Sequence, residues 1–227
     1  MIELYGGQTP NVFKPLVALE ELGVDYRRIR VDILKGEQFS PAFLAISPNN
    51  RVPAIVDLDP VDGSGPLSVF ESGAILLYLA DKCRALIPQH SRGRSVVTEW
   101  LMLQMAGQGP MLGQAGHFRN YAPERIPYAT QRYTKEAQRL CGVLNTRLVG
   151  REFIAGDYSI ADIACWPWIL FRAQHGVTIE DYPEVYRWFK SIEGRPAVRR
   201  VLGDYQPPET LTFTEQERAV LFGQRGR

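Results

Sequence analysis

The chain has 227 residues, of which 45% are hydrophobic, so it holds enough apolar material for one large domain or two small ones. Its formal net charge of +1 gives no electrostatic basis for binding nucleic acid or an acidic membrane surface. The sequence has no apolar run of transmembrane length, and Met1–Tyr5 enters a predicted strand without a signal-peptide pattern. We therefore expect a cytoplasmic protein that binds neither nucleic acid nor membrane.

The first 80 residues alternate between strand and helix patterns. Strands are predicted at Ile2–Tyr5, Tyr26–Val31, Ala54–Leu58 and Leu67–Phe70. Helices are predicted at Asn11–Leu22, with Gly23 as its stop, at Pro41–Ala45 as a single turn, and at Ser72–Lys82. The order βαβαββα is a parallel unit followed by a hairpin, and it predicts an α/β thioredoxin-like domain over residues 1–86.

After Pro88 the pattern becomes purely helical, which predicts an all-α domain over residues 90–203. Helical segments are expected at Ser95–Leu103, Tyr133–Leu148, Ser159 to about His175, and Tyr182–Ile192. Ser159 and Asp162 have the spacing of a capping box, and Pro167 is expected to kink the helix that follows. Residues 204–227 form a tail that begins Pro-rich and ends in a short helix opened by Thr214 and closed by Gly223.

The three cysteines, Cys83, Cys141 and Cys165, are odd in number and widely spaced. They have neither C-x-x-C nor metal-ligand spacing, so they are interpreted as free thiols of a reducing compartment. His90, in a predicted loop, and the isolated His117 and His175 are not expected to catalyse a reaction or to bind a metal. The sequence therefore predicts no metal site.

Two short segments carry the clearest functional pattern. Val52 precedes Pro53, which pushes the Val52 backbone to the extended region, allows a cis bond and interrupts the strand ladder. The N–H and C=O of Val52 can then pair with an extended peptide ligand. Glu71 and Ser72 stand at a predicted helix start, where free N–H groups favour a bound carboxylate. Together the two segments predict a slot for a small, charged peptide.

This pattern, together with Ser159–Asp162 in an all-helical second half, resembles the glutathione transferases over about residues 1–203. Within that superfamily the chain is most similar to the bacterial nu class, the glutathione-dependent disulfide-bond reductases. The runs that carry this finer resemblance are Thr9–Asn11, Lys35–Phe39, Ile46–Asn50, Gly109–Gln114 and Ile126–Ala129. The resemblance implies a glutathione transferase fold, glutathione or its disulfide as ligand, and a homodimer.

The resemblance also implies roles for individual residues. Thr9 and Asn11 would be catalytic, holding the glutathione sulfur as a thiolate. The other implied glutathione-binding residues are Gln38 for the glycyl carboxylate, Val52 and Pro53 for the cysteinyl backbone, Glu71 for the γ-glutamyl ammonium, Ser72 for its carboxylate, and Arg132 for a carboxylate of a second glutathione. Each has an ordinary structural alternative: Thr9 and Ser72 as helix caps, Gln38 in an exposed loop, and Arg132 on a solvated helix face.

Two questions stay open at this level. Either Glu99 or Gln104 could reach the γ-glutamyl ammonium bound in a partner subunit. The class resemblance makes disulfide reduction by bound glutathione the leading functional hypothesis. No cysteine stands near Thr9, so in that reaction every reacting sulfur would come from ligand or substrate. The alternatives are a transferase that conjugates glutathione to electrophiles and a non-catalytic binding or scaffold protein of the same fold.

Overall fold

The computed structural model of the chain describes residues 1–203, 205, 207 and 211–223. Its first part contains a four-stranded sheet of order β2-β1-β3-β4. The strands are β1 (Ile2–Gly6), β2 (Tyr26–Arg30), β3 (Ala54–Asp57) and β4 (Leu67–Phe70). β1 and β2 run parallel, whereas β1–β3 and β3–β4 are antiparallel. This arrangement confirms the parallel unit and hairpin predicted from the sequence.

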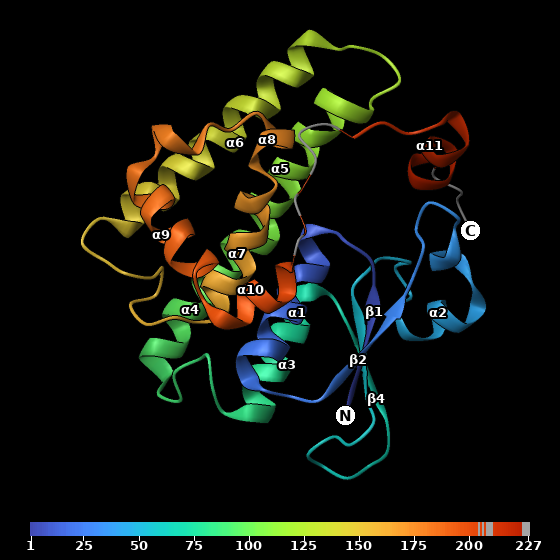
Figure 1. Ribbon diagram of the computed structural model, residues 1–227, viewed down its shortest axis with the longest axis vertical. Helices are drawn as coiled ribbons and strands as arrows, with labels where there is room; N and C mark the ends of the chain where they lie inside the picture. Colours follow the sequence, from blue (N-terminus) through green and yellow to red (C-terminus); the bar gives the residue numbers. More distant parts are fainter. Residues whose placement is uncertain (204, 206, 208–210, 224–227) are drawn as a thin grey trace.

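Helices cover both faces of the sheet. α1 (Pro10–Leu22) and α3 (Ser72–Cys83) lie on the face that meets the helical part of the chain, and α2 (Pro41–Ile46) lies on the other face (Figure 1). A short 3₁₀ turn, η1 (Glu37–Phe39), precedes α2. The predicted stop of α1 is confirmed, since Gly23 adopts the left-handed conformation at its C-cap with φ of 62°.

The part of the chain from Ser91 to Leu202 is helical, as predicted. The elements after α3 are α4 (Ser91–Leu103), the π-helical η2 (Gln104–Gln108), α5 (Gly109–Gly116), the π-helical η3 (His117–Tyr121), α6 (Pro127–Leu148), α7 (Ile160–Leu170), α8 (Arg172–His175), the 3₁₀ turn η4 (Ile179–Asp181), α9 (Pro183–Glu193), α10 (Pro196–Leu202) and α11 (Glu215–Phe222). Every residue of α7 is buried, so this helix forms the centre of the helical part. It also packs against α1 and α3 and joins the two parts of the chain.

The capping box at the start of α7 is confirmed. Asp162 accepts from the N–H of Ser159 at 3.0 Å and from the N–H of Ile154 at 2.9 Å. The Trp188 indole N–H on α9 also donates to Asp162, at 2.9 Å. Because this carboxylate is fully buried, these donors replace the water that it gives up on folding.

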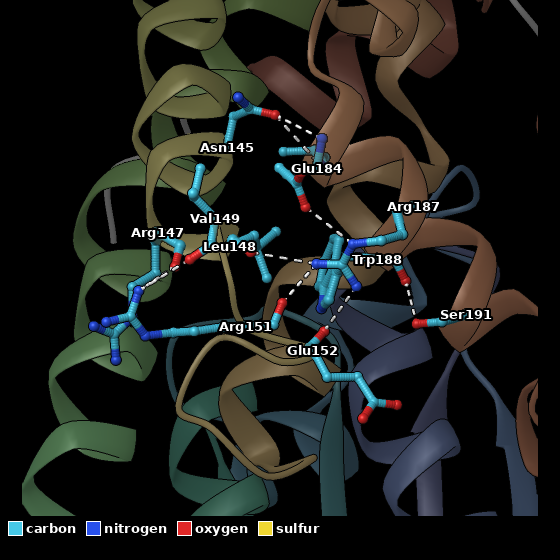
Figure 2. A network of polar contacts seen from close by, with 11 residues as sticks. Asn145, Arg147, Leu148, Val149, Arg151, Glu152, Glu184, Arg187, Trp188 and Ser191 are labelled. Carbon is cyan, nitrogen blue, oxygen red and sulfur yellow. Dashed lines mark hydrogen bonds and ion pairs between the residues drawn. The ribbon is translucent and has the colours of Figure 1, made fainter.

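A second polar network fastens the end of α6 to α9 (Figure 2). The Arg187 guanidinium donates to the carbonyl oxygens of Leu148, Arg151 and Glu152, where α6 has ended and its last carbonyls have no helical partner. Asn145 Oδ1 accepts from the N–H of Glu184 at 2.9 Å. These contacts hold the helical part together at a distance from the site described below.

Three details differ from the sequence-based expectations. α4 starts at Ser91 rather than at residue 95, because the His90 Nδ1 accepts from the Gly93 N–H at 3.2 Å and caps the helix. The helix that contains Pro167 is interrupted at Phe171, which has φ of −90° and ψ of 14°. Of the tail 204–227, the structure shows the predicted helix as α11, opened by Thr214. Residues 204, 206, 208–210 and 224–227 lie outside the described residues.

Candidate functional site

A cavity of about 1390 Å³ opens between the first part of the chain, α5, α7, α8 and α11. The loop before α1, the segment around Gln38 and the loop Asn49–Val52 form one wall. Four of the predicted site residues, Thr9, Asn11, Gln38 and Val52, line this single cavity although they come from separate segments. The cavity is larger than the roughly 300–1,000 Å³ that is typical of small-molecule sites.

Thr9 is the N-cap of α1. Its Oγ1 accepts from the Val12 N–H at 3.4 Å, and Pro10 takes the first helical position, where no N–H is needed. Thr9 therefore does cap the helix, as its structural alternative stated. A hydroxyl both accepts and donates, however, and the cap uses only its acceptor side. The Thr9 O–H remains able to donate to a group in the cavity.

Asn11 is oriented by the helical part of the chain. The Trp168 indole N–H on α7 donates to Asn11 Oδ1 at 3.1 Å. An indole nitrogen can only donate, so this bond fixes the Asn11 oxygen on Trp168 and leaves the Nδ2 amide group as the donor available to a ligand. The sequence analysis missed Trp168, which lies 157 positions away from its partner.

Gln38 is buried rather than exposed in a loop, with only 5% of its surface accessible. Its Nε2 donates to the Ile33 carbonyl at 3.1 Å, which uses one of the two amide hydrogens. Its Oε1 is buried and has no hydrogen-bond partner among the described residues. A buried, unpaired amide oxygen is costly, and a ligand N–H placed in the cavity would satisfy it.

The Val52–Pro53 peptide bond is cis. Within the described part of the chain, no backbone hydrogen bond uses the N–H or C=O of Val52, and both groups are free for an extended ligand. The β3–β4 ladder pairs Ala54 with Phe70. Continuing that register sets Pro53 opposite Glu71, so the two segments singled out in the sequence lie side by side.

The start of α3 is arranged differently from the start of α1. Its N-cap, Glu71, has φ of 69° and ψ of 117° and makes no side-chain cap bond. The first N–H groups of α3 therefore remain available as hydrogen-bond donors. The helix dipole favours an anion as their partner. Glu71 is exposed, whereas Ser72 is nearly buried. Neither residue, nor Pro53, is among those that line the large cavity.

A buried cation lies behind Ser72, and the sequence analysis missed it. Lys14 of α1 is 1% exposed, and its Nζ donates to Ser72 Oγ at 3.3 Å and to Gln104 Oε1 at 2.6 Å. Gln104 is fully buried within the chain, so the expectation that it could reach a ligand bound to a second copy is wrong. Glu99 is exposed on α4 and remains the alternative of that pair.

Arg132 is exposed on α6 and is not one of the residues that line the cavity. The described tail instead supplies an aromatic wall. Phe222 of α11 stacks on Tyr121 with ring centroids 5.7 Å apart, and Phe213 meets Tyr121 edge to face at 5.2 Å. His175 also lines the cavity, and burial lowers its pKa to about 4, so its imidazole is neutral at pH 7.

The three cysteines are poor nucleophiles. Cys141 and Cys165 are buried, and burial raises the pKa of Cys141 to about 12 and that of Cys165 further. Burial also raises the pKa of Cys83. No cysteine lines the cavity. Across the described ranges, no group of three or more His, Cys, Asp and Glu side chains is placed to hold a metal ion.

Comparisons with known proteins place this chain in a family. The glutathione S-transferase N-terminal domain model matches residues 1–81, and the corresponding C-terminal domain model matches residues 122–196. The chain belongs to the glutathione S-transferase family and is an enzyme of that family. This confirms the family resemblance and the thioredoxin-like plus helical fold drawn from the sequence. α11 lies beyond the residues that the two models match.

Individual relatives are similar over most of their length. The disulfide-bond oxidoreductase YfcG of Escherichia coli strain K12 is 51% identical over 203 residues, which cover 89% of this chain and 94% of the relative. A glutathione transferase family member from Pseudomonas fluorescens, solved with two glutathione bound, is 45% identical, with a TM-score of 0.84 over 88% of this chain and 92% of that chain. A glutathione transferase from Pseudomonas putida, solved with one glutathione disulfide per subunit, is 41% identical, with a TM-score of 0.84 over 88% and 90%.

Nowhere in the described ranges is there a helix both long enough and apolar enough to cross a membrane.

Proposed function

We propose that this chain is a glutathione-dependent disulfide-bond reductase that uses two glutathione molecules per site. The observation that carries the proposal is the pair of neutral donors at the start of α1, Thr9 and Asn11, in a cavity with no cysteine. A relative at 51% identity is named as a disulfide-bond oxidoreductase, which supports the same activity here.

The reaction needs no sulfur from the protein. The thiolate of one bound glutathione attacks a substrate disulfide, forms a mixed disulfide and releases one substrate sulfur as a thiolate. The thiolate of a second glutathione then attacks the glutathione sulfur of the mixed disulfide, forms glutathione disulfide and releases the second substrate sulfur. Two glutathione thiols are oxidised, one substrate disulfide is reduced to two thiols, and the two protons pass to the released thiolates.

Hydrogen bonds dominate the stabilisation of the thiolate. Lowering the pKa of a thiol from about 8.5 to about 6.5 requires roughly 2.7 kcal/mol of preference for the ionised form. A helix dipole near the surface supplies only about 0.3–1 kcal/mol. Hydrogen bonds to a charged group contribute about 1.5–3 kcal/mol each, so the Thr9 hydroxyl and the Asn11 amide together are sufficient.

The remaining contacts orient the peptide. The free Nε2 hydrogen of Gln38 is suited to the glycyl carboxylate, and its unpaired Oε1 is suited to the glycyl N–H. Val52, whose N–H and C=O make no backbone hydrogen bond in the described part of the chain, pairs with the cysteinyl backbone. The uncapped start of α3 at Ser72 receives the γ-glutamyl carboxylate, and Glu71 receives its ammonium.

The size of the cavity and the two glutathione molecules bound to the Pseudomonas fluorescens relative support a second glutathione in the same site. Arg132 is assigned to a carboxylate of that second molecule, which its exposure on α6 leaves accessible.

The aromatic wall of Tyr121, Phe213 and Phe222 supports one alternative, conjugation of glutathione to an apolar electrophile. Turnover of 2-hydroxyethyl disulfide and of 1-chloro-2,4-dinitrobenzene by the same preparation separates the two activities. We expect the disulfide to be turned over faster. A faster rate on the chlorobenzene would make conjugation the main activity, and failure to bind glutathione in a calorimetric titration would favour a non-catalytic protein.

The exogenous-sulfur mechanism is tested with a variant in which Cys83, Cys141 and Cys165 are all replaced by alanine. Disulfide turnover should stay within about threefold of wild type, because the buried thiols are protonated at neutral pH. Loss of turnover in a variant that still binds glutathione would overturn the mechanism.

We further propose that the chain is a cytoplasmic homodimer with domains over residues 1–86 and 90–203 and a tail over 204–227. The exposed Leu67 and Phe70 on the edge strand β4 and Met102 on α4 support an apolar contact with a second copy. Light scattering should give twice the 25.7 kDa mass of the chain, and a value near 25.7 kDa would contradict the dimer.

A further inference from the structure

Lys14 is the one buried lysine in the part of the chain that the structure describes, and the proposed reaction does not yet use it. A lysine is almost never fully buried without a reason, because its ammonium loses its hydration. The Lys14 Nζ is held between Ser72 Oγ at 3.3 Å and Gln104 Oε1 at 2.6 Å. Neither partner carries a charge that would balance the ammonium.

The carboxylate whose charge acts on Lys14 is that of Glu71, which is exposed and makes no bond to the ammonium. On α7 the neighbouring titratable group is the protonated thiol of Cys165. Arg200 of α10 pairs with Glu20 at the far end of α1. On β1, Glu3 pairs with Arg27. The unliganded protein therefore contains a buried ammonium without a partner anion.

The geometry also determines which way the Ser72 hydroxyl can act. An ammonium has three donors and no acceptor, so Ser72 Oγ must accept from Lys14. The Ser72 hydrogen is then left with Met105 Sδ at 3.8 Å, a weak acceptor. A hydroxyl held in this way keeps its hydrogen for a ligand carboxylate, and the charge of Lys14 behind it disfavours a ligand ammonium at the same place.

We propose that Lys14 is a positioning residue for the γ-glutamyl end of the site, where its ammonium orients the Ser72 hydroxyl as a donor and supplies the charge that a ligand α-carboxylate pairs with across Ser72. The proposal rests on the proposed glutathione site at α3. It explains how the site distinguishes the two ends of the γ-glutamyl group: the carboxylate binds at Ser72, in front of the cation, and the ammonium binds at Glu71.

Proton uptake on binding is a consequence of this arrangement. Burial lowers the pKa of Lys14 to about 7 in the unliganded protein, so part of the population is neutral at pH 7.5. An anion brought to Ser72 favours the ammonium and raises that pKa. Binding should therefore take up a fraction of a proton at this pH, and affinity should fall as the pH rises above 7.

The test compares two ligands that lack a free thiol: S-methylglutathione and its analogue without the γ-glutamyl α-carboxylate, 4-aminobutyryl-S-methylcysteinylglycine. Affinities are measured by calorimetry at pH 6.5 for wild type and for Lys14→Met, a substitution that preserves the length and apolar stem of the side chain. We expect the substitution to weaken the binding of S-methylglutathione by about tenfold to a hundredfold, which corresponds to the loss of a hydrogen bond to a charged group. The affinity for the analogue should fall by less than about threefold, because the analogue has no α-carboxylate that could interact with Lys14.

Wild-type protein gives a second readout that needs no variant. Calorimetry at pH 7.5 in buffers of different ionisation enthalpy should show net proton uptake with S-methylglutathione and none with the analogue. The analogue keeps the amine, so contributions from the ligand ammonium and Glu71 cancel in the comparison.

The outcomes separate the two proposals. If Lys14→Met loses the same affinity for both ligands, or if wild type takes up the same number of protons with both, Lys14 is a purely structural residue. The proposed glutathione site would be unaffected by either result. If neither ligand binds wild type, the glutathione site itself is wrong and the role of Lys14 falls with it.

Discussion

The starts of α1 and α3 are two helix N-termini in one fold, and they are capped differently. At α1, Thr9 caps the helix and offers a neutral hydroxyl, with the Asn11 amide beside it. At α3, the N-cap Glu71 makes no cap bond, and the ammonium of Lys14 lies behind Ser72. In the proposed site, a reactive sulfur is held by neutral donors, whereas a permanent carboxylate is met by charge.

This difference has a chemical reason. A full positive charge next to the sulfur would stabilise the thiolate but would also lower its nucleophilicity, because nucleophilicity falls as the thiol pKa falls. Neutral donors lower the pKa towards the working pH without going far below it. The γ-glutamyl carboxylate takes no part in the reaction, so the strongest available interaction can be used to bind it.

The largest effect should come from Thr9. Thr9→Ala removes the donor to the thiolate, and we expect the kcat/KM for 2-hydroxyethyl disulfide to fall by about a hundredfold, or about 2.7 kcal/mol. Thr9→Ser is the matched control, since it keeps both the cap to Val12 and the hydroxyl donor. Activity of Thr9→Ser as low as that of Thr9→Ala would show that the hydroxyl is not the relevant group.

A smaller loss, about tenfold, is expected for Trp168→Phe. Phenylalanine keeps the ring packing on α7 but lacks the N–H that fixes the Asn11 amide, so the amide can turn its oxygen towards the thiolate. In an Asn11→Ala background the same substitution should cost almost nothing further. Additive losses in the double variant would mean that Trp168 acts independently of Asn11.

The smallest effect concerns stability at the start of α3. Burial lowers the pKa of Lys14 to about 7 in the folded protein, against about 10.4 in an unfolded chain. Between these values the unfolded state binds more protons, so the stability due to this group rises with pH. From pH 7 to pH 8, the unfolding free energy of wild type should gain about 1 kcal/mol relative to Lys14→Met. Denaturation curves that keep a constant separation between the two proteins would contradict this.

Local sequence patterns predicted much of this molecule. The strands, the Gly23 stop of α1 and the capping box of Ser159 and Asp162 follow from residue types a few positions apart. Ser72 was singled out as a candidate because helix starts have a local signature. Thr9 and Gln38 were candidates only through the family resemblance, and nothing in the neighbourhood of Gln38 predicted its burial.

The missed residues share a different property. Trp168 acts on Asn11 and Lys14 acts on Ser72 and Gln104 across 157, 58 and 90 positions of the chain. The sequence of α1 alone predicts that Lys14 is exposed to solvent. Its burial follows only from the packing of α7 and α3 against α1. His90 was missed as a cap for a simpler reason, since histidine is not among the residues that usually cap helices.

The most direct test of the thiolate site is the pKa of glutathione bound to wild type, measured from the ultraviolet difference absorbance of the thiolate as the pH is raised. Thr9 and Asn11 predict a bound thiol with a pKa about two units below the free value, and Thr9→Ala should recover most of that shift. A bound thiol that titrates as free glutathione does in buffer would contradict the account.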